Sequence, residues 1–274
     1  MGLTRLALRF ALKKPKIDSF SRFLFIGPHP DDIEIGAGAT AAKLASMGKK
    51  VSFLICMDGR FGDACADRLP EYRELLAKKE FSGPEERGNA LAEIRRKESL
   101  KSAEMLGVSD VRFLNLRDGG QYDQAEMLRG IAKTVSDFRP DIIFAPDPLS
   151  RSESHKDHLE TGACAREIAC FAPYPGIMAG YGAENPADVQ AIAYYMTARP
   201  NAFVKTSGLL PLQLRSVFDC HLSQYPEGSQ EAKDIALYLT LRAHDFGLRS
   251  FHRTAEGFRM LTKTEMHCLP EAGE

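Results

Sequence analysis

The chain has 274 residues, enough for one large domain or two small ones, and its composition excludes several classes of protein. Apolar residues make up 44% and charged residues 27%, which is ordinary for a soluble globular protein. A formal net charge of -1 argues against binding of nucleic acid through a broad basic surface, so we expect no nucleic-acid partner. Six cysteines without a Cys-x-x-Cys pair are too few for a disulfide scaffold. We expect Cys56, Cys164 and Cys170 to be reduced and in or near the core, as in a cytoplasmic protein.

Residues 1–20 are predicted to form an amphipathic extension. Residues 1–16 carry apolar and basic side chains at helical spacing, without the uninterrupted apolar stretch of a membrane span or the cleavage signal of a secretory leader. We expect a short helix packed on the domain or on a neighbouring subunit. The alternative is contact of residues 1–16 with a membrane surface. Whether the chain forms a homo-oligomer is left open.

From residue 22 onward, short apolar runs alternate with longer amphipathic segments. This pattern is typical of a parallel β-sheet covered by helices on both faces, so we predict a Rossmann-like, three-layer α/β/α fold. Strands are expected at residues 23–26, 50–56, 111–116, 141–145 and 191–196 and near Phe258. Helices are expected at residues 36–47, 89–106, 124–138, about 208–223 and 229–246. We predict one domain over residues 21–265, a tail over 266–274, and a long polar loop over 57–88 that has a functional role.

The first charged motif follows the first predicted strand. His29, Asp31, Asp32 and Glu34 fall within six residues, beside the end of a buried strand. A bound divalent cation would balance this concentration of carboxylates. The alternative is a polar turn in which Asp32 caps the following helix.

The second motif, Ser154-His-Lys-Asp-His158, follows the fourth predicted strand and begins a helix. His155 and His158 are three residues apart and would share one face of that helix. Ligand sites of parallel sheets lie beyond the carboxyl ends of the strands, so we expect loops 27–36 and 145–158 to meet there. One of the two histidines, with His29 and Asp32, makes the two-histidine, one-carboxylate set of a catalytic zinc site. Iron, manganese or cobalt would also suit these ligands.

The other polar residues of the two motifs suit hydrolysis. A metal ion polarises a water molecule and a scissile carbonyl group. Asp31 is adjacent to a ligand and free to act as the base. The non-ligating histidine, His155, could donate a proton to the oxyanion or to the leaving amine, and Asp157 would raise its pKa.

The motif Pro28-His-Pro-Asp-Asp-Ile-Glu-Ile-Gly36, followed by Gly38 and by His155-Lys-Asp-His158, resembles the PIG-L or LmbE-like family of zinc-dependent N-acetylglucosaminide deacetylases. Residues 95–98, 106–108, 198–201 and 221–224 are also similar to that family, and the resemblance extends over residues 20–260. It implies a hydrolase of linear amides that removes acetyl groups from an amino sugar.

The resemblance also implies roles for individual residues. The zinc ligands would be His29, Asp32 and His158. Asp31 would be the general base, and His155, tuned by Asp157, the electrostatic and acid partner. Arg95 would contact sugar hydroxyls. The family's usual Gly-Glu after the second strand is replaced by Asp58-Gly-Arg60, which makes Asp58 the candidate sugar-binding acid, and His221 is a further candidate substrate contact.

Alternatives remain at several positions. Glu34 is expected to support the loop, because three protein ligands and a water fill a catalytic zinc site. Arg95 could instead form an ion pair with Glu98. Gly36 and Gly38 do not complete the G-x-G-x-x-G nucleotide pattern, and the acids before them would repel a pyrophosphate. For the whole chain, the alternatives are a deacylase of a non-sugar amide and a non-catalytic binding protein that contains a metal.

Overall fold

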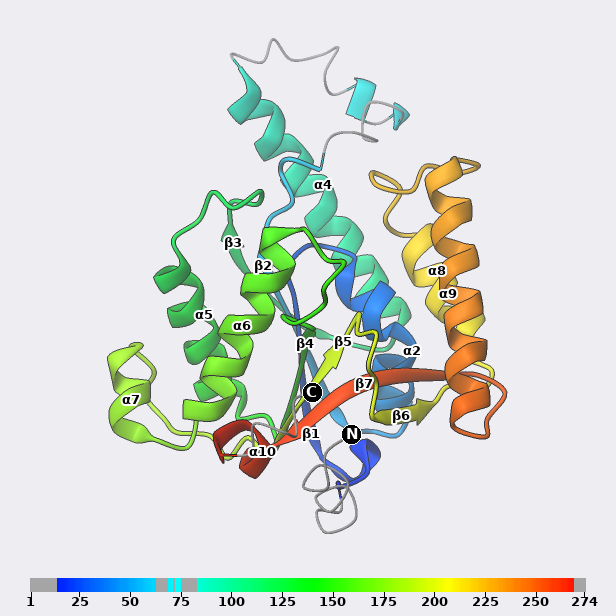
Figure 1. Ribbon diagram of the computed structural model, residues 1–274. Helices are drawn as coiled ribbons and strands as arrows, with labels where there is room; N and C mark the ends of the chain where they lie inside the picture. Colours follow the sequence, from blue (N-terminus) through cyan, green and yellow to red (C-terminus); the bar gives the residue numbers. More distant parts are fainter. Residues whose placement is uncertain (1–13, 63–68, 71, 75–82, 269–274) are drawn as a thin grey trace.

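The computed structural model describes residues 14–62, 69–70, 72–74 and 83–268. A seven-stranded β-sheet lies between two layers of helices, with the strands in the order β3-β2-β1-β4-β5-β7-β6 (Figure 1). The strands are β1 (Arg22–Gly27), β2 (Lys50–Met57), β3 (Asp110–Leu116), β4 (Ile142–Pro146), β5 (Ala191–Tyr195), β6 (Ala202–Lys205) and β7 (Ala255–Thr262). The first five strands are parallel, and β7 runs antiparallel to both β5 and β6. The predicted three-layer fold with a mainly parallel sheet is confirmed.

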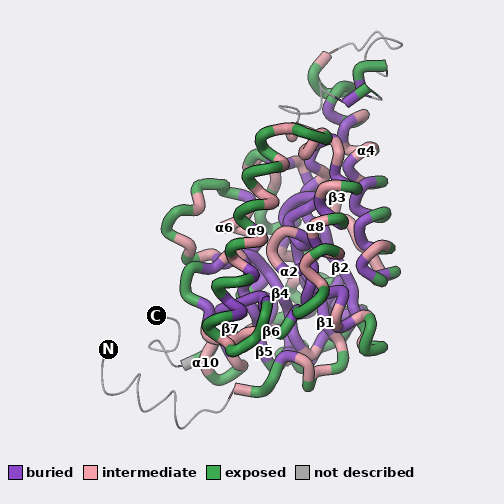
Figure 2. Tube along the Cα trace, turned by 90° about the vertical axis from the view of Figure 1, so that its right-hand side faces the viewer, coloured by how far each residue is buried: buried purple, intermediate pink, exposed green. Residues whose placement is uncertain are grey.

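Side chains of β1 alternate between the two halves of the core. Phe23 and Phe25 face one helical layer, whereas Leu24 and Ile26 face the other, and all four are fully buried. Strands buried on both faces read as continuous apolar runs, which is why the sequence shows them clearly. Figure 2 shows the buried strands at the centre and exposed residues along the outer faces of the helices.

The first helical layer consists of α2 (Asp32–Ser46), α4 (Pro84–Met105), α8 (Leu210–Phe218) and α9 (Gln230–Arg249) (Figure 1). The opposite layer consists of α5 (Gln124–Phe138) and α6 (Lys156–Phe171), and α10 (Lys263–Cys268) packs against α6. The short helix α7 (Pro175–Gly180) follows α6, and the 3₁₀ turn η1 (Ile17–Ser19) precedes β1. No helix among the described residues is long and apolar enough to cross a membrane.

The order of the parallel strands reverses between β1 and β4. β2 and β3 lie on one side of β1, and β4 and β5 continue on the other. Phe25 of β1 pairs with Phe144 of β4, so both strands end at the same edge of the sheet. Chains that leave neighbouring strands in opposite directions open a crevice at this point, where doubly wound sheets bind ligands. The two motif loops follow β1 and β4, so the fold brings them to this crevice.

Several boundaries differ from the prediction. α2 begins at Asp32 rather than at residue 36, and α4 begins at Pro84, with Glu85 and Glu86 in its first turn. Residues 84–88 of the predicted loop are therefore helical. α10 crosses the start of the predicted tail, and Ile17 of the predicted extension belongs to the core. Most of the extension, and with it the predicted membrane contact, lies outside the described residues.

Candidate metal centre

The turn between β1 and α2 has a strained backbone. Asp31 has a φ of 123°, a value that residues other than glycine rarely adopt. Arg95 of α4 donates to the carbonyl oxygen of Pro30 at 2.9 Å, and this hydrogen bond stabilises the turn. Gly36 packs against the ring of Tyr195, where a Cβ atom would lie 2.1 Å from the ring. The glycine is needed for this close packing, which places the first turn of α2 over the strand ends.

His29, Asp32 and His158 bring three candidate ligand atoms within 4.8 Å of one another. His29 Nδ1 lies 3.1 Å and His158 Nε2 3.5 Å from the same carboxylate oxygen of Asp32. The three side chains come from the two motif loops, which meet as the topology requires. Two imidazoles and one carboxylate around a common point suit a divalent transition metal with an open position for water.

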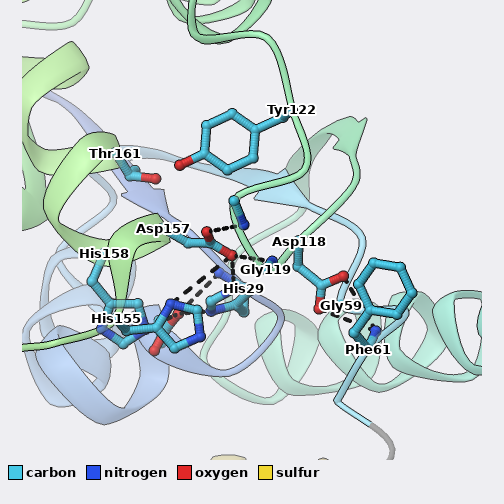
Figure 3. A network of polar contacts seen from close by, with 12 residues as sticks. His29, Gly59, Phe61, Asp118, Gly119, Tyr122, His155, Asp157, His158 and Thr161 are labelled. Carbon is cyan, nitrogen blue, oxygen red and sulfur yellow. Dashed lines mark hydrogen bonds and ion pairs between the residues drawn. The ribbon is translucent and has the colours of Figure 1, made fainter.

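Asp157 holds His29 in place (Figure 3). Its carboxylate accepts from His29 Nε2 at 2.9 Å and from the backbone N–H groups of Gly119 and Gly120 at 2.7 and 2.8 Å. With Nε2 bound in this way, Nδ1 of His29 is directed to the candidate metal site, the arrangement that orients histidine ligands in metalloproteins. Asp157 is fully buried, and its nearest approach to His155 is 3.9 Å, so its main partner is His29.

The two histidines of the second motif have different surroundings. Glu153 accepts from Nδ1 of His158 at 2.9 Å, which leaves Nε2 directed to Asp32. The side chain of His155 is 46% exposed and lies beside the rings of His29 and His158. Partial burial and these two neighbouring imidazoles lower the pKa of His155, although Asp157 opposes the change. Asp157 thus acts on the pKa of His155 in the expected direction, but burial and the two imidazoles outweigh it.

The electrostatics of the first loop depend on burial and on contacts within it. Burial alone would lower the pKa of His29, but hydrogen bonds to Asp157 and Asp32 raise it to about 9. Burial would raise the pKa of Asp32, but His158 and His29 hold it well below its usual range. Burial raises the pKa of Asp31 to about 6, against the opposing charge of Arg95. Asp31 thus accepts a proton more readily than Asp32 does.

The three candidate substrate-binding residues have largely buried side chains. Arg95 is 4% exposed, and it donates to the carbonyl oxygens of Gly59 and Pro30 and lies 3.4 Å from Asp31. His221 is fully buried, with Nε2 3.5 Å from Glu34. In these positions Arg95 contacts the turn and Asp31, and His221 contacts Glu34. Asp58 is paired with Arg60 at 2.6 Å.

Three features of the site were not predicted. Glu153 orients His158, and the Gly119–Gly120 amides hold Asp157. Asp118 accepts from the Phe61 amide at 3.2 Å and lies in the same network (Figure 3). Burial raises the pKa of Asp118. Asp118 lies two residues after β3, and this position could have identified it in the sequence, because the ends of β1, β3 and β4 share one edge of the sheet.

Comparisons with known proteins give a consistent result. The model of the PIG-L family (GlcNAc-PI de-N-acetylase) matches residues 24–169. A diacetylchitobiose deacetylase of Thermococcus kodakarensis is 33% identical over 270 residues, which cover 97% of this chain and 92% of the relative. A 1D-myo-inositol 2-acetamido-2-deoxy-alpha-D-glucopyranoside deacetylase of Catenulispora acidiphila is 31% identical over 199 residues, or 66% of this chain and 57% of the relative.

Solved structures show the same likeness. The N,N'-diacetylchitobiose deacetylase of Pyrococcus horikoshii superposes with a TM-score of 0.78 and 33% identity, and the match covers 98% of this chain and 93% of that one. A conserved protein of Thermus thermophilus shares the fold at a TM-score of 0.64 and 22% identity, over 87% of this chain and 93% of that one.

Proposed function

Since the chain belongs to the PIG-L family of de-N-acetylases, we propose that it is a metal-dependent hydrolase that removes the acetyl group from an N-acetylglucosamine-type amino sugar or its conjugate. The relatives named as deacetylases of such sugars support this substrate class. The observation that carries the proposal is the placement of Asp31, a buried carboxylate outside the ligand set, directly beside the cluster of His29, Asp32 and His158.

The proposed ligands are His29, Asp32 and His158, and the proposed ion is zinc. The same donors also suit iron(II) or another divalent metal. When bound, such an ion polarises a water molecule and the acetamide carbonyl. Asp157 then has a supporting role, because it fixes the tautomer and the orientation of His29.

Asp31 is the proposed base that takes the proton of the attacking water. Its pKa of about 6 leaves it ionised at neutral pH and close enough to neutrality to accept a proton efficiently. His155 is the proposed donor to the oxyanion and the leaving amine. A neutral imidazole still carries one N–H donor, so His155 can stabilise the oxyanion although its pKa is lowered.

Acetate release tests the proposed function. The protein supplied with zinc is incubated with N-acetylglucosamine, N,N'-diacetylchitobiose and an N-acetylated amino acid. Release from the sugars alone is expected. Release from the amino acid alone would favour the non-sugar deacylase. No release from any substrate, with less than about half an equivalent of divalent metal in gently purified protein, would favour a binding protein.

The variant Asp31→Asn tests the base. We expect turnover to fall by about 10²–10⁴-fold, because the amide cannot accept the proton, while the metal content stays unchanged. Asp137→Asn is the matched control, since Asp137 has a side chain that is 70% exposed on α5. Full turnover of Asp31→Asn with zinc bound would show that another group is the base.

A further inference from the structure

The outer face of α9 carries a cluster of exposed apolar side chains. The described residues include eleven exposed large apolar or aromatic side chains, and five of these lie between Leu237 and Phe251. The exposed fractions are 59% for Leu237, 61% for Leu241 and 79% for Leu248. Single exposed leucines are normal on a globular protein, but a cluster of them on one element marks an interaction surface.

α9 is apolar on two opposite faces. One face packs against β7 and buries Leu239, Ala243 and Phe246. Each exposed leucine is two residues from one of these positions, about half a turn of the helix, so it projects from the opposite face. α9 lies at the outer edge of the first helical layer (Figure 1). The second apolar face is therefore turned away from the sheet.

The second face has the spacing of a helix-pairing stripe. Leu237, Leu241, His244 and Leu248 follow one another at intervals of four, three and four residues, and all four are exposed. Alternating intervals of three and four residues bring side chains into the single stripe along which two helices pair. The stripe thus suits another helix that carries the same pattern, and α9 of a second copy is such a helix.

The charges beside the stripe favour antiparallel pairing of two copies. Asp234, near the beginning of α9, and Arg249, at its end, are exposed on the same flank of the stripe. In an antiparallel pair, Asp234 of each copy lies beside Arg249 of the other, whereas parallel copies would bring like charges together. Arg249 is 3.5 Å from Asp245 of its own helix, and a guanidinium group can bind a second carboxylate.

The same charges argue against a membrane as the partner. Asp234 and Asp245 are exposed beside the leucines and would be repelled by anionic lipids. Helices that lie on membranes carry mainly lysine and arginine on their polar flanks.

We propose that α9 forms the contact of a two-fold symmetric homodimer, in which the stripe from Leu237 to Leu248 packs antiparallel on the same stripe of a second copy. Leu237 then meets Leu248 of the other copy, and Leu241 meets His244. The stripe contains none of the proposed metal-site residues, so the inference does not depend on the proposed function.

Sedimentation equilibrium of the full chain tests the proposal. We expect a wild-type dimer at about 100 µM. Leu237→Asp/Leu241→Asp should raise the dissociation constant at least about a hundredfold, because the contact would bury unpaired carboxylates. Leu100→Asp, at a position of α4 that is 45% exposed, is the matched control and should dimerise like the wild type. An unchanged dissociation constant of the double variant, or equal dissociation of Leu100→Asp, overturns the proposal.

A monomeric wild type at about 100 µM also overturns the proposal. Its sedimentation with vesicles of anionic phospholipid would then identify a lipid surface as the partner of the stripe.

Charge exchange tests the antiparallel arrangement without changing the leucines. Asp234→Arg and Arg249→Asp are each expected to raise the dissociation constant about threefold to tenfold, because each change brings like charges together. The variant with both changes should return to within about twofold of the wild type, since opposite charges meet again. A loss in this variant as large as the two single losses combined overturns the proposal.

Discussion

His155 and His158 stack with ring planes 13° apart, yet their neighbours prepare them for different tasks. Nδ1 of His158 is held by Glu153, whereas the ring of His155 is half exposed and has no comparable partner among the residues described. A ligand needs a fixed orientation, and a proton donor needs access to the substrate. The contacts therefore favour His158 as the ligand and His155 as the donor.

Alanine variants distinguish these two roles. We expect His158→Ala to lose bound metal and His155→Ala to keep it, while turnover of His155→Ala falls by about 10²–10³-fold because an oxyanion donor is removed. Metal analysis and acetate release on the same preparations provide the two measurements. Loss of metal from both variants to the same extent would contradict the assignment.

Asp157 affects the site through His29. We expect Asp157→Asn to weaken metal binding by about 10–100-fold. Asp157 accepts from both His29 and the backbone, whereas asparagine has only one accepting oxygen and so no longer fixes the tautomer of His29. Titration of zinc against a competing chelator measures the affinity. Asp137→Asn again serves as the control, and equal affinities of the two variants would show that the backbone alone orients His29.

At the scale of elements, α2 is broken at Ala37, whose φ of -154° is not helical. The N–H groups of Ala39 and Thr40 donate to the carboxylate of Glu256 on β7, at 3.1 and 2.6 Å. Gln213 of α8 donates to Glu256 and to the carbonyl oxygen of Glu34, both at 2.9 Å. Two side chains thus replace helical hydrogen bonds, and the first turn of α2 is free to follow the metal-site loop.

The buried carboxyl of Glu256 makes stability depend on pH. Burial raises the pKa of Glu256 from 4.5 to about 7, although hydrogen bonds from Thr40 and Ala39 act to lower it. The pKa of Glu256 is higher in the folded state than in the unfolded state. The protonated carboxyl therefore contributes its full stabilisation of the folded state below about pH 4.5, and this contribution is lost as the pH rises through about 7. Relative to Glu256→Gln, the free energy of unfolding of the wild type should fall by about 3 kcal/mol over this window.

Denaturant unfolding at several pH values measures this difference. Glu184→Gln, at an exposed position, is the control and should track the wild type at every pH. A constant difference between the wild type and Glu256→Gln across the window would show that the carboxyl is equally protonated in both states.

At the scale of the molecule, the last strand connects both halves of the site to the remainder of the fold. Arg259 of β7 donates to Asp147, the residue after β4, and both side chains are 5% exposed. Asp147 begins the segment that leads to Glu153 and His158. The pair therefore anchors the second motif loop to β7, while Glu256 of the same strand supports α2.

Breaking this buried pair should be costly. We expect Arg259→Ala to lower the free energy of unfolding by about 3–5 kcal/mol, because Asp147 is left buried and unpaired. Arg112→Ala removes a partly exposed pair with Asp110 and should cost less than about 1 kcal/mol. Denaturant unfolding compares the two variants, and similar losses would mean that water compensates Asp147.

The sequence predicted the sheet and the meeting of the two loops because those features depend on local patterns. Continuous apolar runs identify the parallel strands, and the motifs follow them directly. The partners of single polar groups depend on the tertiary fold. Asp157 is two residues from His155 but binds His29, which is 128 residues away. Arg95 is buried where it donates to the carbonyl oxygen of Pro30, which lies 65 residues away in the chain. The spacing of residues along α4 cannot reveal this contact.

The place of β7 has a consequence for synthesis of the chain. β7 pairs with β5 and β6 and supplies Glu256 and Arg259, yet it leaves the ribosome about a hundred residues after His158. At a rate of synthesis of about 5–20 residues per second, all three proposed ligands are made several seconds before β7 can pair with β5. A chain that ended after the family-matched segment would contain all three proposed ligands but lack β5, β6 and β7, and the unpaired edge of β4 would make it prone to aggregation.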